Sequence, residues 1–165
     1  MLVASSPVCL PAEEWQIPWE AAKGDRKVVL PYRPVSLDRF LLEIPAGHEE
    51  ADQDRKEGLK PASAKVRLLT TFRGRNVFEV TMEVKDSYYD RYHFIIAEVE
   101  EGRYMPIFGC QYAEGSLSLD ESIVSSTDEK LELLVKSRVN GTDPGGPTYH
   151  LSLGKDFKPS FTETD

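Results

Sequence analysis

The sequence predicts an all-β protein, a single antiparallel sandwich or small barrel of about seven strands preceded by an irregular, proline-rich N-terminal arm. Apolar and polar residues alternate with a period of two in several segments, which is typical of strands with one buried face. Turn residues separate these segments at short intervals, which favours antiparallel pairing of consecutive strands. At 165 residues the chain has the size of one domain, so we expect residues 1–165 to form a single β-domain.

The first 26 residues are expected to be irregular, because prolines at positions 7, 11 and 18 interrupt any long helix. Residues 26–32, "RKVVLPY", predict a short strand at an edge or with an early end, since Pro31 cannot donate to a ladder. Residues 37–44, "LDRFLLEI", place Phe40, Leu42 and Ile44 on one face at period two. Two helical turns are the alternative, and the closely flanking prolines favour a strand.

A β-hairpin over residues 65–84 is the clearest signal in the sequence. Gly74 stands between two apolar segments, where the chain must turn. The second segment alternates an apolar set with a more polar one: Phe78, Val80, Met82 and Val84 against Val77, Glu79, Thr81 and Glu83. We expect the first set to face the core and the second to face solvent.

Four further strands are predicted by the same alternation and by enrichment in aromatic and β-branched residues. They cover residues 89–100, 103–111, 131–139 and 147–153. Two long polar loops are expected at 45–61 and 112–130, and a loose tail at 158–165.

The charge of the chain limits its partners. Asp and Glu number 28 and Lys and Arg 20, so the net charge is −8. Such a surface repels the phosphates of nucleic acids and favours a basic protein partner. No apolar stretch is long enough for a membrane-spanning helix, and the sequence does not indicate an oligomeric state.

The two cysteines, Cys9 and Cys110, suggest the compartment. A disulfide between them would tie the irregular arm to the sheet, which predicts a periplasmic or secreted protein. The alternative is that both are free thiols and act as small buried hydrophobes. "LVAS" near the start has the small residues expected near a signal-peptide cleavage site, so this segment could be the end of a signal peptide, and the alternative is a plain disordered start.

Catalytic and metal-binding motifs are not found: the sequence has no CxxC, HExxH, EF-hand, phosphate-binding or GxSxG motif. We therefore predict no catalytic residue, no metal site and no cofactor. Two alternatives stay open. Cys110 could act with a histidine if His93 and His150 share a surface, and scattered histidines could meet carboxylates in space.

The segment 112–130 is the predicted contact with a partner. It is long for a β-protein and carries five acids against one lysine. Its small hydroxyl residues suit insertion into a narrow cleft, and its acids suit a basic surface. The predicted binding residues are Asp120, Glu121, Ile123, Val124, Ser125, Ser126 and Asp128. The alternatives are an ordinary surface loop or a further strand, "ESIVSS".

Together these features favour a non-catalytic, exported protein-binding domain, of the kind that acts as an inhibitor or immunity protein against a secreted bacterial enzyme. The first alternative is a lipocalin-like carrier of a small ligand. Its binding wall would comprise Trp15, Trp19, Tyr92, Phe94 and Tyr104. The second alternative is a hydrolase with an unrecognised site.

Overall fold

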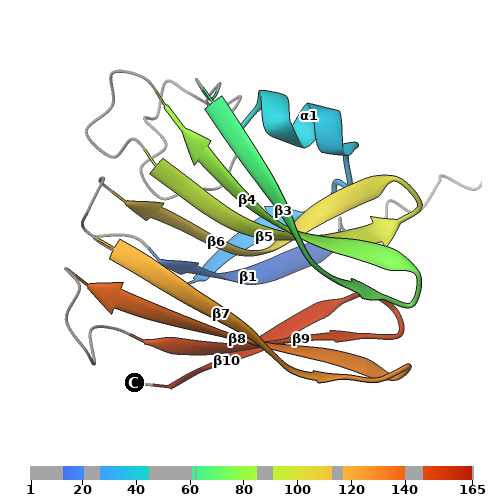
Figure 1. Ribbon diagram of the computed structural model, residues 1–165. Coiled ribbons are helices and arrows are strands. Elements are labelled where there is room, and N and C mark those ends of the chain that lie inside the picture. The colour runs from blue at the N-terminus through green and yellow to red at the C-terminus, as the bar shows by residue number, and fades with distance from the viewer. Residues whose placement is uncertain are drawn as a thin grey trace, which may run out of the picture.

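In a computed structural model the chain forms a β-sandwich with a short helix on one outer face (Figure 1). The structure describes residues 13–20, 27–44, 61, 63–84, 91–112, 117–139 and 147–164. The all-β prediction is confirmed, with ten strands rather than about seven. The strands are β1 (Glu14–Glu20), β2 (Lys27–Pro31), β3 (Ser63–Phe72), β4 (Arg75–Glu83), β5 (Arg91–Glu100), β6 (Arg103–Tyr112), β7 (Leu117–Ser126), β8 (Lys130–Val139), β9 (Thr148–Gly154) and β10 (Pro159–Thr164).

One sheet has six strands in the order β2-β1-β6-β5-β4-β3, and the other has four in the order β10-β9-β8-β7. All pairs are antiparallel except β1 with β6, which run parallel. The strands β3 and β7 are edge strands, and Figure 1 shows them on the same side of the sandwich. The two strands therefore form the rim of the interface between the sheets on that side.

The six-stranded sheet has an apolar layer on each face. On β5, Ile95 and Ala97 point into the core between the two sheets. Phe94 and Ile96 point the other way, into a second core that also contains Phe40 of the helix. The near-continuous apolar composition of β5 thus follows from burial on both faces.

Residues 37–42 form helix α1 (Leu37–Leu42), so the predicted strand over 37–44 is wrong. Ser36 is the N-cap, and its side-chain oxygen accepts a hydrogen bond from the backbone N of Arg39 at 3.3 Å. Phe40 packs edge-on against Phe94 with ring centroids 5.4 Å apart. Leu37 and Leu41 pack against the same core, so the apolar residues of this segment follow the spacing of a helix rather than period two.

Three segments expected to be irregular contain strands. The predicted arm contains β1, the predicted loop 112–130 contains β7, and the predicted tail contains β10. Pro18 is tolerated in β1 because it is the last residue paired with β2, and Trp19 then pairs with β6 instead. Most of the predicted loop 45–61 lies outside the described residues.

The apolar face of β4 meets a core as predicted, although Phe78 is only half-buried. The opposite face does not point to solvent, which corrects the prediction. Val77 is buried in the core between the sheets, and Glu79 is half-buried on the same face. No helix of the described residues is long and apolar enough to cross a membrane.

Candidate functional site

A cleft of about 220 Å³ opens between the edge strands β3 and β7. Its lining residues come from both sheets: Arg67, Leu69, Ile95, Glu121, Ser122, Ile123 and Leu133. Each edge strand has a β-bulge beside the cleft, which places Leu69 and Val124 out of register with their partner strands. The Arg73 guanidinium spans the same edge and donates to the carbonyl oxygen of Asp128 at 2.7 Å.

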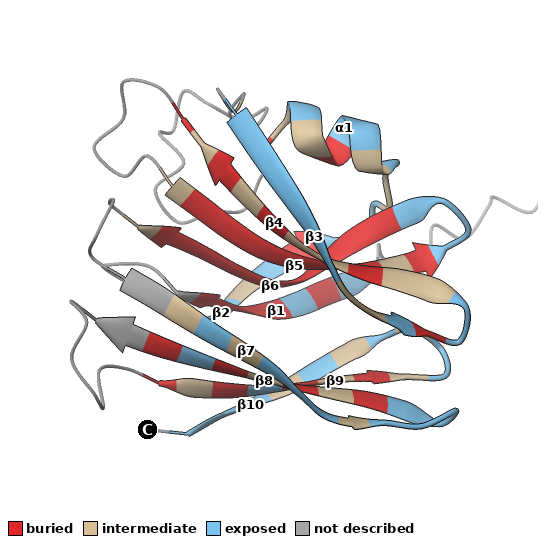
Figure 2. Cartoon of the chain, in the orientation of Figure 1, coloured by how far each residue is buried: buried red, intermediate tan, exposed pale blue. Residues whose placement is uncertain are grey.

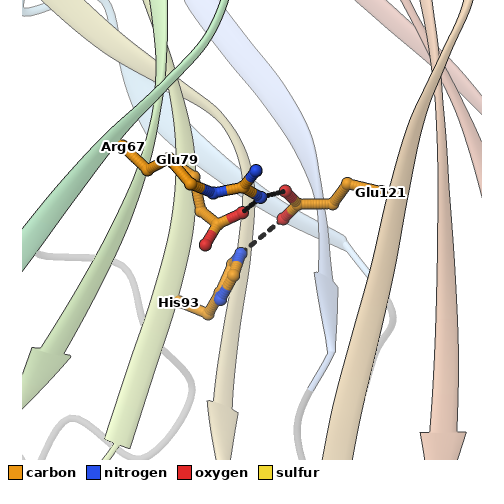
Figure 3. Close-up of polar contacts among 4 residues, drawn as sticks. All are labelled: Arg67, Glu79, His93 and Glu121. Atoms are coloured by element: carbon orange, nitrogen blue, oxygen red, sulfur yellow. Dashed lines mark hydrogen bonds and ion pairs between the residues drawn. The ribbon is translucent and has the colours of Figure 1, made fainter.

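Four ionisable side chains meet at this cleft (Figure 3). Arg67 lies on β3, Glu79 on β4, His93 on β5 and Glu121 on β7. Arg67 is directly opposite Glu79 in the β3–β4 register, and His93 is opposite Thr81, two residues further along β4. The first three residues therefore share one face of the six-stranded sheet, and Glu121 reaches them from the other sheet.

The contacts within this cluster are short. His93 Nε2 and Glu121 Oε1 lie 2.5 Å apart. Arg67 Nη2 pairs with the Glu79 carboxylate and lies 3.4 Å from Glu121 Oε2. The side chains of His93 and Glu121 are 9% and 7% exposed, whereas that of Arg67 is 64% exposed. The cluster thus has a buried inner part and a single solvated cation at its mouth.

The carboxyl groups of Glu79 and Glu121 have pKa values shifted in opposite directions. Burial raises the pKa of Glu121, and the nearby Glu79 carboxylate raises it further. Burial acts to raise the pKa of Glu79 as well, but hydrogen bonds with Glu121 and Arg67 outweigh it, so that the pKa of Glu79 is lowered. The hydrogen bond with His93 acts to lower the pKa of Glu121, but burial outweighs it, so the two glutamates are shifted in opposite directions.

Such an arrangement can support acid–base chemistry or hold a cation. Two carboxyl groups with separated pKa values match the pattern of a general acid and base. The ligand atoms of Glu79, His93 and Glu121 also lie within 4.8 Å of one another, which suits a metal ion.

Sequence reasoning missed this cluster. His93 and Glu121 are 28 residues apart, belong to no motif and meet only because the two sheets pack together. The pairing of Arg67 with Glu79 was not accessible from the sequence either. A regular register from the predicted turn at Gly74 would place Arg67 opposite Val80, and the bulge at Leu69 shifts β3 by one residue so that Arg67 lies opposite Glu79.

The predicted binding residues of 112–130 gather on β7 and the turn that follows it. Glu121 belongs to the cluster, and Ile123 lines the cleft while remaining exposed. Val124 is the exposed residue of the bulge. The remaining four, Asp120, Ser125, Ser126 and Asp128, are exposed apart from half-buried Ser125. Their role in binding stays a prediction.

The structure does not bring His93 and His150 onto one surface, because β5 and β9 belong to different sheets and do not pair. His93 faces the inside of the sandwich, whereas His150 is exposed on β9. Cys110 lies opposite His93 in the β5–β6 register and is fully buried in the core between the sheets. The described residues contain no disulfide-bonded pair of cysteines, and Cys9 lies outside them, so the disulfide stays a prediction.

The aromatic residues proposed for a carrier's binding wall are core residues. All five, Trp15, Trp19, Tyr92, Phe94 and Tyr104, are buried. The indole nitrogen of Trp15 donates to the carbonyl oxygen of Pro106 at 2.7 Å, and Trp19 packs on Phe94 with ring centroids 5.9 Å apart. Comparisons of the chain with protein-family models, curated proteins and solved structures found no match.

Proposed function

We propose that the protein is a non-catalytic, exported protein-binding domain, and that it binds a basic protein partner through the edge formed by β3 and β7. One observation carries the proposal. Six large hydrophobic residues are exposed among those the structure describes, and four of them lie on these two strands. The four are Val66, Leu68, Ile123 and Val124. Figure 2 shows that β3 is exposed over most of its length.

Exposed apolar residues that gather at one edge are typical of protein-binding surfaces, whereas single exposed residues are common everywhere. Charged residues surround them here, with Lys65 and Arg67 on β3 and Asp120 and Asp128 around β7. Val66 and Leu68 lie opposite Val80 and Phe78, on the α1 face of β3, whereas Ile123 lines the cleft on the other face. The exposed apolar residues therefore flank this edge on both faces. The bulges in β3 and β7 hinder the addition of another strand, so we expect recognition through side chains.

The expected partner is basic, because the chain has a net charge of −8. We infer that the partner is an enzyme outside the cytoplasm and that the protein acts as its inhibitor or immunity protein. The turn between β7 and β8 supports this mode, since the Thr127 hydroxyl accepts from the backbone N of both Glu129 and Lys130 at 3.2 Å. A hairpin tip ordered in this way loses little entropy when it enters a cleft.

Surface substitutions test the binding edge. The immobilised wild-type protein should capture one basic partner protein in a stoichiometric amount. Val124→Arg places bulk and charge at the bulge, where the side chain is 58% exposed, and should weaken binding at least tenfold. Val29→Arg is the matched control, because Val29 is a β-branched residue, 50% exposed, on the opposite edge strand β2. If Val29→Arg abolishes binding and Val124→Arg does not, the proposed edge is wrong.

Two further variants separate the tip of the hairpin from its charge. The double substitution Ser125→Arg with Ser126→Arg should prevent the hairpin tip from entering a cleft of the partner, and so abolish binding while the fold remains intact. Neutralising Asp120 and Asp128 to Asn should slow association and flatten its salt dependence, with a smaller effect on dissociation. Surface kinetics with the captured partner measures both. Unchanged affinity in the double arginine variant would exclude the hairpin tip as the plug.

We propose a disulfide between Cys9 and Cys110, and this disulfide is the argument for export, because disulfides persist in oxidising compartments. Cys110 is fully buried between the sheets, so the arm that carries Cys9 would have to reach this core. Burial also protects a free Cys110 thiol in the native state, and the test therefore uses the unfolded chain. Intact mass after alkylation in denaturant without reductant should show no adduct. Two adducts would exclude the disulfide and remove the support for export.

A further inference from the structure

We propose that Glu79, His93 and Glu121 form a binding site for a divalent transition-metal ion of the zinc type. The three residues come from three strands of two sheets, and one atom of each lies within 4.8 Å of the others. This inference goes beyond the proposed protein-binding function and does not depend on it.

The geometry needs only small side-chain movements. Ligand atoms bound tetrahedrally at 2.0–2.2 Å from zinc are about 3.4 Å apart. The closest pair here, His93 Nε2 and Glu121 Oε1, is separated by 2.5 Å and would have to open by about 1 Å to reach this spacing. The largest separation would have to shrink by a similar amount. Rotation of two glutamate side chains provides both changes, while the strands hold the backbone in place.

The chemistry of the ligands favours zinc over magnesium or calcium. An imidazole nitrogen suits zinc, whereas magnesium and calcium prefer oxygen ligands alone. Three protein ligands leave a fourth position for water or another group. The neighbouring cleft, which Glu121 also lines, gives that position access to solvent and to any molecule bound there.

Arg67 neutralises the site without a metal ion, since its guanidinium pairs with both carboxylates. A divalent cation bound by the same carboxylates would displace it. Arg67 can leave because its side chain is 64% exposed and lies at the mouth of the cluster. The arginine and the metal ion therefore compete, and this competition separates a metal site from a cluster that only holds the sheets together.

Isothermal titration of the chelator-treated, full-length protein with zinc chloride tests the proposal. We expect saturable binding of one ion, and binding more than tenfold weaker in His93→Ala and Glu121→Gln. Matched controls are His150→Ala and Glu132→Gln, which change exposed and half-buried residues away from the cluster and should bind zinc as the wild type does. Circular dichroism verifies the fold of each variant. Glu79→Gln, at a more exposed ligand, serves as the second test if His93→Ala does not fold.

The decisive variant is Arg67→Gln. It should bind zinc more tightly than the wild type, whereas Lys65→Gln, on the same exposed strand, should leave the affinity unchanged. A merely structural role for Arg67 predicts no such gain. The proposal is overturned if the wild type shows no one-to-one zinc binding, if the ligand variants bind as tightly as the controls, or if Arg67→Gln and Lys65→Gln have equal affinity.

Discussion

The two faces of β4 and β5 have different roles, although they belong to the same two strands. The face under α1 is packed with apolar side chains, among them Val80, Met82 and Phe94, each at most 1% exposed. The face toward the second sheet is apolar in its centre and carries Glu79 and His93 near the open edge. The face under α1 provides stability, while ionisable groups gather where the second sheet leaves the strands within reach of water.

The physical reason lies in what covers each face. Helix α1 covers the first face and brings Phe40 onto Phe94 in an edge-to-face contact. The second sheet has four strands against six, and its edge strand β7 brings Glu121 close to β4 and β5. Charged groups are costly to bury without partners, so they occur where the Arg67 guanidinium can reach them from solvent.

The largest effect is expected from the closed face. Phe94→Ala removes the ring that contacts Phe40, Trp19 and Tyr92, and should lower the free energy of unfolding by about 3–5 kcal/mol. Ile123→Ala, at the open edge, should change it by under about 1 kcal/mol, because that side chain is already exposed. Urea denaturation measures both. Equal losses would contradict the division between a stabilising face and an accessible edge.

Gly109 tests how tightly the closed face is packed. A Cβ atom at this position would lie 2.5 Å from the Trp19 ring and 3.1 Å from Phe94. Gly109→Ala should therefore lower the free energy of unfolding by about 1–3 kcal/mol, as overpacking does. Gly154→Ala is the control, because its Cβ would meet only the Asp156 side chain at 3.4 Å. Equal thermal stability of the two variants would show that the Trp19 packing adapts.

Glu79→Ala probes the face toward the second sheet. A solvent-facing glutamate would contribute little to the free energy of unfolding, but the structure places Glu79 in the cluster, so we expect a larger loss. Its removal leaves Arg67 without a carboxylate that it contacts and removes a hydrogen-bonding group next to Glu121. We expect a loss of about 1 kcal/mol. Glu83→Ala, four residues along the same strand with a more exposed side chain, should have a smaller effect. The reverse order in denaturant melts would contradict the cluster.

The smallest effect concerns pH, measured in the presence of a chelator. Because burial raises the pKa of Glu121, the folded protein retains this proton, and stability falls as pH rises from the ordinary glutamate value of about 4.3 toward the raised pKa. The lowered pKa of Glu79 acts oppositely, and its contribution is lost as pH falls below the ordinary value.

Glu121→Gln resembles the protonated acid and should flatten the decline of stability on the alkaline side of this window. Glu79→Gln should instead flatten the loss on the acidic side. Urea melts at a series of pH values measure both slopes. Slopes that match the wild type in both variants would contradict the opposite pKa shifts of Glu79 and Glu121.

The sequence by itself determined the local elements. Alternation at period two located β4, β8 and β9, and the turn at Gly74 located the β3–β4 hairpin, where Arg73 and Gly74 both have positive φ. These features depend on neighbours in the chain, so local patterns suffice to predict them. The turn alone did not place Arg67 opposite Glu79, because the bulge at Leu69 shifts the register of β3 by one residue.

Only the tertiary structure decided what covers each face and which distant residues meet. Alternation distinguishes two faces of a strand, but a helix, a second sheet or water can cover either one, and Glu79 was therefore misplaced. Pairing with β2 and then β6 made a strand of the proline-containing β1, and packing on Phe94 made a helix of residues 37–42. His93 and Glu121 meet across two sheets because sheet packing, rather than sequence spacing, brings their strands together.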